Sequence, residues 1–232
     1  MQEASVHTLV FSSSATVYGA PQYLPLDEEH PASATSPYGR TKLHIEEILR
    51  DVALATPAWR IACLRYFNPA GAHDSGLIGE SPRGIPNNLM PYINQVACGQ
   101  TPRLNVYGAD YDTPDGTGVR DYIHVIDLAA GHLAALGFLQ HQVGNHVFNL
   151  GTGRGYSVLE VKHAFEAACG RTIPYQVVPR RAGDIACSYA NSVKAQSVLG
   201  WRAERSLESM CASAWCHQSK ILHPAGNAIR LR

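Results

Sequence analysis

A tyrosine and a lysine four residues apart form the pattern in this sequence with the most evident chemistry. Tyr38 and Lys42 begin and end the segment Tyr-Gly-Arg-Thr-Lys, and a helix places residues at this spacing on one face with their Cβ atoms about 5–6 Å apart. An ammonium group that close favours the phenolate, which lowers the pKa of a tyrosine from about 10 toward neutrality. The pair therefore predicts a general base, although the same spacing also occurs on solvated helices that have no function.

The elements around the pair make the functional interpretation more specific. The run His7–Ser12 is short, apolar and bounded by polar residues, which is typical of a buried parallel strand, and it ends in three consecutive serines. Ser36 is a plausible N-cap and Pro37 suits the first helical position, so a helix is predicted from there to about Ala55.

An apolar stripe along this helix is expected to anchor it on the sheet. Ile45, Leu49 and Val52 continue the face that carries Tyr38 and Lys42, so we expect them in the core. The tyrosine and lysine would then emerge at the ends of the strands, where open α/β sheets bind their ligands.

The remaining elements alternate between strand and helix. Ser157 and Glu160 have capping-box spacing, Gly170 and Gly200 suit helix ends, and Pro91 is expected to interrupt its helix early. The predicted strands are 60–67 and 145–150, and the predicted helices are 87–98, 126–139, 157–170, 191–199 and 206–220. This alternation predicts an α/β fold, a partial doubly wound parallel sheet with a smaller lobe.

Composition excludes several classes of protein. The 232 residues are 45% hydrophobic, and 19 basic residues balance 19 acidic ones, which leaves no electrostatic footprint for nucleic acid or an anionic membrane. Six cysteines without a C-x-x-C pair and without a secretory leader predict reduced thiols in a cytoplasmic protein. The eleven histidines lack metal-ligand spacing and no run of eighteen apolar residues occurs, so neither a metal site nor a membrane span is expected.

Several longer motifs carry a resemblance to a known family. They are FSSSATVYG (11–19), SPYGRTK (36–42), LRYFNPAGAH (64–73), GIPNNLMPYI (84–93), DGTGVRDYIHVIDLA (115–129), FNLGTG (148–153) and PRRAGD (179–184). In this order and with compatible spacing, from about residue 6 to about residue 218, the sequence resembles the UDP-glucose 4-epimerases, which are extended short-chain dehydrogenases/reductases.

The resemblance implies a fold, a cofactor and a reaction. Residues 1–68 and 122–156 would be the C-terminal part of a Rossmann-type NAD domain, and 69–121 and 157–232 an interleaved UDP-sugar domain of the smaller α/β type. A tightly held NAD would oxidise the sugar at C4, the 4-keto intermediate would turn, and the hydride would return to its other face. UDP-galactose and UDP-glucose would interconvert without net redox change.

Roles for individual residues follow from the same resemblance. Tyr38 would take the proton of the C4 hydroxyl, Ser14 would hydrogen-bond that oxygen, and Lys42 would tune Tyr38 and hold the nicotinamide ribose. The implied cofactor-binding residues are Ser12, Tyr38, Lys42 and Phe67. The implied substrate-binding residues are Asn68, Asn88, Leu89, Asn105, Val106, Tyr107, Arg120, Arg181, Asp184 and Ser188. Taken singly, Asn68 and Asn88 could be turn residues, and Arg120 could form an ordinary ion pair with Asp121.

The sequence departs from the family where a dinucleotide-binding glycine motif is expected. No G-x-G-x-x-G precedes Ser12, and Gly151–Gly155 has the spacing G-x-G-x-G without a suitable acidic residue after it, which favours a simple turn. We therefore expect the first half of the sheet to be absent from this chain, and the chain alone to bind NAD weakly or not at all and to be marginally stable. A homodimer, or complementation by a separate N-terminal half, would cover the exposed edge.

A second departure concerns the back of the sugar pocket. Ser188 stands where many relatives carry a bulky tyrosine, which predicts room for N-acetylated UDP-hexosamines unless Tyr189 shifts register and fills the gap. Two other functions stay open. The chain could be a non-catalytic UDP-sugar-binding remnant, or a related dehydratase or decarboxylase; a dehydratase, however, needs an acidic residue beside the serine, and Ser14-Ala15-Thr16 supplies none.

Overall fold

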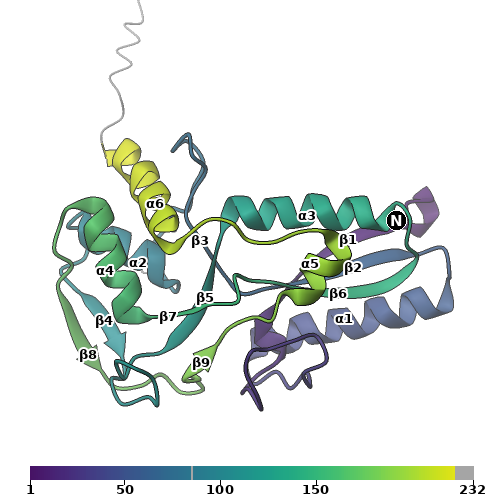
Figure 1. Ribbon diagram of the computed structural model, residues 1–232, viewed down its shortest axis with the longest axis horizontal. Helices are drawn as coiled ribbons and strands as arrows, with labels where there is room; N and C mark the ends of the chain where they lie inside the picture. Colours follow the sequence, from purple (N-terminus) through teal and green to yellow (C-terminus); the bar gives the residue numbers. More distant parts are fainter. Residues whose placement is uncertain (85, 223–232) are drawn as a thin grey trace, which may run out of the picture.

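The structure is a computed structural model that describes residues 1–84 and 86–222. The chain forms two lobes along one long axis (Figure 1). Residue 85 and residues 223–232, which belong to the predicted ranges 69–121 and 157–232, lie outside the described part. None of the described helices combines the length and the apolar character needed to cross a membrane.

One lobe is built on a parallel sheet. Its three strands are β1 (Thr8–Ser14), β2 (Arg60–Tyr66) and β6 (Gly144–Leu150), in the order β1-β2-β6. Helix α1 (Pro37–Ala55) and helix α3 (Val125–Leu139) cover opposite faces of the sheet (Figure 1). The α/β fold class predicted from the alternation of elements is confirmed, since these parallel strands are joined by helices.

Capping residues fix where the predicted helices begin and end. Ser36 accepts a hydrogen bond from the backbone N–H of Gly39 at 3.0 Å, with proline at the first position of α1. Ser157 and Glu160 form the predicted capping box of α4 (Val158–Cys169), and Gly170 closes that helix at φ 66°. Gly200 closes α5 (Val193–Leu199) at φ 64° in the same way. Left-handed backbone is accessible to glycine without a Cβ clash, which explains both ends.

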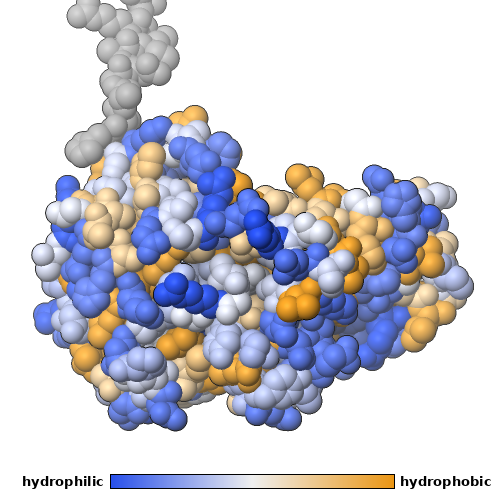
Figure 2. All heavy atoms as spheres, viewed as in Figure 1, coloured by the Kyte–Doolittle hydropathy of each residue, from blue (hydrophilic) through white to orange (hydrophobic). Residues whose placement is uncertain are grey.

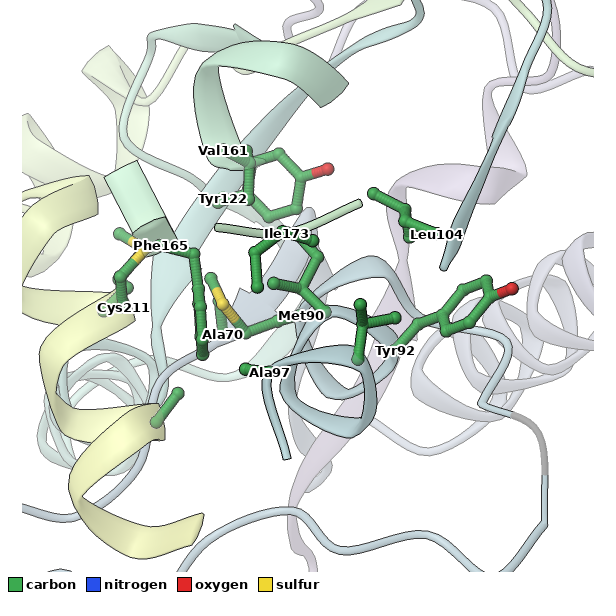
Figure 3. Close-up of a cluster of buried hydrophobic side chains, with 14 of the residues drawn as sticks. Ala70, Met90, Tyr92, Ala97, Leu104, Tyr122, Val161, Phe165, Ile173 and Cys211 are labelled. Carbon is green, nitrogen blue, oxygen red and sulfur yellow. The ribbon is translucent and has the colours of Figure 1, made fainter. Parts of the chain in front are cut away.

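The second lobe packs three helices over a small sheet. Helices α2 (Leu89–Ala97), α4 and α6 (Leu207–Leu222) surround a cluster of buried apolar side chains, with β4 (Leu104–Tyr107) and β8 (Tyr175–Val178) paired in parallel beside them. Figure 3 shows Val161 and Phe165 of α4 pointing toward Met90 of α2 and Cys211 of α6. This lobe therefore has a closed apolar core of its own.

A third group of strands connects the lobes. β5 (Val119–His124) pairs in parallel with β3 (Asn68–Ala70) and β9 (Cys187–Ser188), and antiparallel with β7 (Gly155–Ser157). Because these partners come from distant parts of the sequence, β5 brings three segments to the boundary between the lobes. A short 3₁₀ helix (Ala15–Val17) follows β1 and another covers Gln2–Ala4.

Three expectations about the elements were wrong in detail. Ile45 is 37% exposed, whereas Leu49 and Val52 pack on the sheet, because the buried residue of that helical turn is the charged Glu46. Pro91 does not interrupt its helix, since α2 begins at Leu89 and the missing N–H of a proline is tolerated in the first turn. The segments of β4, β5 and β8 are strands rather than irregular chain.

Candidate active site

A cavity of about 540 Å³ opens between the lobes at the C-terminal ends of β1 and β2. The surface is indented between the lobes in Figure 2. The 3₁₀ helix after β1, the start of α1, β3, β5 and the segment before β9 complete its walls. Its lining includes Ser13, Ser14, Ala15, Thr16, Thr35, Ser36, Tyr38, Tyr66, Phe67, Asn68, Asn88, Arg120, Asp184, Ile185 and Ser188.

Ser14 and Tyr38, the first two predicted catalytic residues, line this one cavity. Ser14 caps the 3₁₀ helix, with its Oγ accepting from the backbone N–H of Thr16 at 3.2 Å and from the Thr16 hydroxyl at 3.0 Å. Gly39 lets the first turn of α1 approach closely, since a Cβ there would lie 2.6 Å from the carbonyl oxygen of Thr16. The tyrosine is 56% exposed, so its hydroxyl is open to a ligand.

Lys42, the third predicted catalytic residue, reaches the same strand from the next turn of α1. Its Nζ donates to the carbonyl oxygen of Ser12 at 2.9 Å and stands 5.5 Å from the centre of the Tyr38 ring. The Ser12 hydroxyl lies 2.7 Å from the Tyr66 hydroxyl, which also contacts the Nε2 atom of His132. Burial raises the pKa of Tyr66, and the nearby Ser12 hydroxyl opposes that rise. Tyrosine and lysine therefore meet at the serine-rich end of β1.

A second cavity of about 160 Å³ continues the first into the α-helical lobe. Asn68, Asn88, Arg120 and Asp184 line both cavities. The further predicted substrate residues that line the second are Leu89, Asn105, Tyr107 and Arg181. The guanidinium of Arg181 stacks on the Tyr107 ring at 3.7 Å, and it lowers the pKa of that phenol by hydrogen bonding. Planar guanidinium forks suit phosphate oxygens, and a neighbouring aromatic ring suits a nucleobase or sugar.

Three predicted residues do not line either cavity with their side chains. Val106 is 1% exposed and packs in the core of the helical lobe. Ser12 and Lys42 lie beside the first cavity, on its β1 side. Phe67, by contrast, is buried at 6% exposure and does line the first cavity. The roles assigned to these residues stay predictions.

Comparison with known proteins decides the family. A family model described as GDP-mannose 4,6 dehydratase matches residues 1–214. The UDP-glucose 4-epimerase of Homo sapiens is 59% identical over 227 residues, and that of Bacillus subtilis is 57% identical over 219. A UDP-glucose 4-epimerase from Stenotrophomonas maltophila, solved with bound NAD and formylated UDP-arabinopyranose, superposes with a TM-score of 0.94 at 53% identity, covering 97% of this chain and 67% of its own.

The chain belongs to the UDP-glucose 4-epimerase family. It spans 65% of the length of the human and Bacillus epimerases, which themselves cover 97% and 94% of it. The epimerase of Bifidobacterium longum, in complex with NAD⁺ and UDP, is 56% identical with a TM-score of 0.91 over 95% of this chain and 66% of its own. A UDP-Glc/GlcNAc 4-epimerase from Campylobacter jejuni is 38% identical with a TM-score of 0.78, over 94% and 66%.

In this epimerase-family chain, Asp121 is a buried junction and not the ion-pair partner of Arg120. Its carboxylate accepts from the backbone N–H groups of Thr152, Gly153 and Ala190 at 2.9–3.1 Å. Arg120 turns the other way, 4.0 Å from the carboxylate of Asp184. Burial raises the pKa of Asp121, and the hydrogen bonds from Thr152, Ala190 and Gly153 oppose that rise. Two N–H groups of the glycine-rich loop bind Asp121, which is the geometry of a turn, and the absence of a phosphate cradle there stays a prediction.

A small side chain, that of Ser188, lies in the wall of the first cavity. Ser188 lies in β9, is 8% exposed and lines the cavity. The side chain of Tyr189 lies beside Gly155, where an added Cβ would meet its Cδ1 at 3.4 Å. Tyr189 is not among the residues that line the first cavity. The structure therefore does not place Tyr189 in the wall of the first cavity by a shift of register.

Sequence reasoning missed several polar groups near the cavity. Thr16 and Ser36 line it, and Tyr66 joins Ser12 to His132. Glu46, four residues after Lys42, is buried below it. The continued spacing of four along α1 is the one signal that could have identified Glu46, whereas the contacts of Tyr66 depend on residues distant in sequence.

Proposed function

We propose that this chain supplies the catalytic and UDP-hexose-binding part of a UDP-glucose 4-epimerase, interconverting UDP-galactose and UDP-glucose through a 4-keto sugar. The observation that carries the proposal is one continuous cavity. It has Ser14 and Tyr38 at one end and Arg181 with Tyr107 at the other, joined by shared lining residues. A hexose joined through a diphosphate to uridine has the same order of groups.

Proton transfer at the sugar would belong to Tyr38. Its exposed hydroxyl takes the proton of the C4 hydroxyl as the sugar is oxidised and returns it when the ketone is reduced. Ser14 holds the same oxygen, and its own hydroxyl is oriented by Thr16. The hydrogen bond from Lys42 to the carbonyl oxygen of Ser12 fixes the position of the ammonium group. From that position its positive charge supports the proton transfer at Tyr38. The proton leaves and returns at one atom, so the reaction needs no external acid.

The residues on the β1 side fit the nicotinamide end of NAD. Lys42 and Ser12 offer an ammonium and a hydroxyl for ribose oxygens, and Phe67 and Tyr66 offer flat apolar surface beside them. Bound NAD supplies a hydride acceptor and donor for C4. The N–H groups of Thr152 and Gly153 are bound to Asp121, which argues against this loop as the pyrophosphate site. We infer that the 232-residue chain holds NAD weakly by itself.

The nucleotide would lie in the second cavity. Arg120 and Arg181 face the diphosphate with charge-assisted hydrogen bonds, Asn88 and Asn105 offer amide groups, and Tyr107 offers a ring face. Asp184 lies 4.0 Å from Arg120 and would orient that guanidinium. This binding does not require the cofactor, so it separates the substrate part of the proposal from the redox part.

Turnover tests the proposal. The purified chain, with excess NAD, is given UDP-galactose and the formation of UDP-glucose is followed, with Tyr38→Phe as the blank and Tyr175→Phe as the matched control. Tyr175 is 46% exposed on β8 and is among the lining residues of neither cavity. We expect turnover that Tyr38→Phe lowers by about 10²–10⁴-fold and Tyr175→Phe leaves unchanged. Equal turnover in all three samples would contradict the roles proposed here.

A non-catalytic UDP-sugar-binding chain is the second candidate. The observation that favours it is the outer edge of β1, which pairs with no strand within residues 1–84 and 86–222. A folded sample that binds UDP and gives no turnover would support this candidate. If addition of a separate N-terminal segment restored turnover, the result would instead support the first candidate, the epimerase. Coexpression and size-exclusion chromatography test that complementation, and homodimer formation with it.

A dehydratase is less well supported. Protonating a leaving hydroxyl needs a carboxyl group near the serine, and among the described residues that line the first cavity Asp184 is the one carboxylate, next to Arg120. The residue after Ser14 is alanine. Absence of a 4-keto-6-deoxy product from the turnover assay is expected.

The small side chain of Ser188 in the cavity wall supports a wider substrate range. We infer that N-acetylated UDP-hexosamines are converted as well as UDP-glucose and UDP-galactose, because the small side chain leaves room at the back of the cavity. Ser188→Tyr should abolish conversion of the acetylated pair and retain that of UDP-galactose, whereas Ser188→Ala should retain both. No conversion of the acetylated pair by the unaltered enzyme would refute this proposal.

A further inference from the structure

A buried polar layer crosses the three-stranded sheet directly under the cavity. Ser13 of β1, Arg65 of β2 and Asn149 of β6 are register partners. They are 1%, 6% and 0% exposed. The neighbouring positions Ile61–Leu64 on β2 are apolar and fully buried. One transverse row of the sheet is therefore polar, directly after four buried apolar residues of the central strand.

Glu46 of α1 ties this row to the helix. Its carboxylate accepts from Arg65 Nε at 3.0 Å and from Nη2 at 2.6 Å, and it also accepts from the hydroxyl of Ser13. The side chains of Arg65 and Glu46 are 8% and 6% exposed. On the other side, the guanidinium lies 4.7 Å from the ring of Tyr18, whose hydroxyl donates to Asn149 at 2.6 Å.

A buried ion pair is weak support for stability, because removing two charges from water offsets most of their attraction. Specific geometry is the better explanation for keeping one. Bidentate Arg–carboxylate pairs fix both distance and orientation. Here the pair joins α1 to the central strand and, through Ser13, to the edge strand. It therefore constrains the position of α1 relative to β1.

Tyr38, Lys42 and Glu46 form one line along α1 at intervals of four residues. Lys42 binds the carbonyl of Ser12, and Glu46 binds the hydroxyl of Ser13. The next residue of β1 is Ser14, which shares the cavity with Tyr38. Two turns of the helix, at Lys42 and Glu46, are thus attached to the adjacent residues Ser12 and Ser13 of the strand, and Tyr38 and Ser14 line the cavity beside these attachments.

We propose that Glu46, held by Arg65, is a positioning residue that sets the location of the Tyr38 hydroxyl relative to Ser14. Glu46 is not among the residues that line either cavity, and it acts by fixing the position of α1 on β1 through Arg65 and Ser13. The inference rests on the proposed function for its kinetic consequence. Its structural consequence, a displaced or mobile Tyr38 ring, does not depend on turnover.

The structural consequence is measured first. Tyrosine in the full chain is replaced by 3-fluorotyrosine, and the line of Tyr38 among the 11 tyrosines is assigned from its loss in Tyr38→Phe. Glu46→Gln keeps the side-chain shape and removes the charge. We expect the ¹⁹F line of Tyr38 to shift or broaden in this variant. Ser13→Ala, which removes a single hydroxyl and keeps the ion pair, should move the line less.

Lys162→Gln is the matched control. Lys162 and Glu166 form a second ion pair, at 2.7 Å, on α4 in the other lobe, with the lysine buried and the glutamate partly buried. Breaking it should lower thermal stability as Glu46→Gln does, without moving the Tyr38 line. In the epimerase assay, Glu46→Gln should lower kcat by about 10–100-fold, because small displacements of reacting groups have effects of that size, while KM changes by less than about threefold. Lys162→Gln should leave kcat unchanged.

The outcomes separate the two proposals. A folded Glu46→Gln sample with the Tyr38 line and kcat of the unaltered chain would overturn the positioning role, as would equal effects from Lys162→Gln. If Glu46→Gln does not fold, Ser13→Ala becomes the deciding variant. An unchanged ¹⁹F line of Tyr38 in that variant would overturn the inference. If the unaltered chain shows no turnover, the proposed function fails while the ¹⁹F result still decides the role of Glu46.

Discussion

The central strand β2 and the edge strand β1 of the β1–β2–β6 sheet differ in how completely they are covered. Ile61–Leu64 on β2 are fully buried, whereas their register partners on β1 include Leu9, Val10 and Phe11, which are partly exposed. Apolar residues of both flanking helices are also exposed, such as Ile48 of α1 at 59% and Leu133 of α3 at 71%. Figure 2 shows apolar side chains at several places on this lobe.

The helical lobe presents the opposite case. Its core cluster includes Val161, Phe165 and Met210 at 0% exposure, and the second cavity is built on that core. The substrate side of the site therefore rests on a closed core, and the β1 side rests on a sheet edge that the described residues leave unpaired. The contrast predicts that the proposed UDP site and the proposed NAD site depend on different parts of the molecule and can be separated by experiment.

The largest expected effect compares register partners on β1 and β2. Ile61→Ala removes a fully buried side chain and should lower the free energy of unfolding by about 2–5 kcal/mol. Its partner Leu9 is only partly buried, so Leu9→Ala should cost about half of that or less. Urea denaturation of both variants measures the difference. Equal losses would mean that β1 is as well covered in solution as β2, which contradicts the contrast.

The next effect concerns the affinity of the proposed UDP site in the second cavity. Arg181→Ala removes a guanidinium that stacks on Tyr107 in the second cavity, and should weaken UDP binding by about 10–100-fold, the range for one charge-assisted contact. Arg154→Ala is the control, because Arg154 stacks on Tyr156 outside both cavity linings. Isothermal titration with UDP measures both. Unchanged affinity in Arg181→Ala would remove Arg181 from the proposed site.

The smallest effect is a pH dependence at the junction of the lobes. His124 Nδ1 accepts from the N–H of Ile126 at 3.1 Å and caps α3, while Nε2 contacts Ser213 Oγ at 3.0 Å. Burial, and then the charge of Arg205, lower the pKa of His124, although Asp127 and Asp74 oppose them. The folded state therefore binds fewer protons, and the contribution to stability present above the ordinary histidine pKa is lost as pH falls through the lowered value.

Thermal unfolding between pH 7.5 and pH 5 measures this dependence. His124→Asn keeps a side-chain acceptor for the helix cap and removes the titrating group, so the slope of Tm against pH should become shallower. His124→Ala also loses the cap, at a cost of about 1 kcal/mol. A slope in His124→Asn as steep as that of the unaltered chain would assign the pH dependence to other groups.

Local sequence signals predicted much of the sheet lobe and its helices. The cap at Ser36 and the capping box at Ser157 act within four residues, so the starts of α1 and α4 could be read from the chain. β5 could not be predicted in the same way, because its pairing depends on β3, β7 and β9, which come from distant segments. Glu46 is charged, and its burial depends on Arg65, 19 residues away.

The same distinction between local and long-range signals applies to the site residues. The pair Tyr38 and Lys42 follows from helical spacing, and both meet the serine-rich end of β1 as that spacing requires. The interpretation of Arg120 with Asp121 as an ion pair failed, because adjacent residues of a strand point to opposite sides. The buried contacts of Asp121 depend on a loop 31 residues away and have no local signal.

Thermal unfolding of one preparation with UDP and with NAD tests the contrast most directly. The proposed UDP site predicts that UDP at about one hundred times its Kd raises Tm by about 5–10 °C, because a ligand that binds only the folded state stabilises it by mass action. NAD at the same concentration should raise Tm by no more than about 1 °C, and nucleotide release from the purified chain should show little bound NAD. A shift with NAD as large as that with UDP, or full NAD occupancy on purification, would show that the β1 side is complete and would contradict the account.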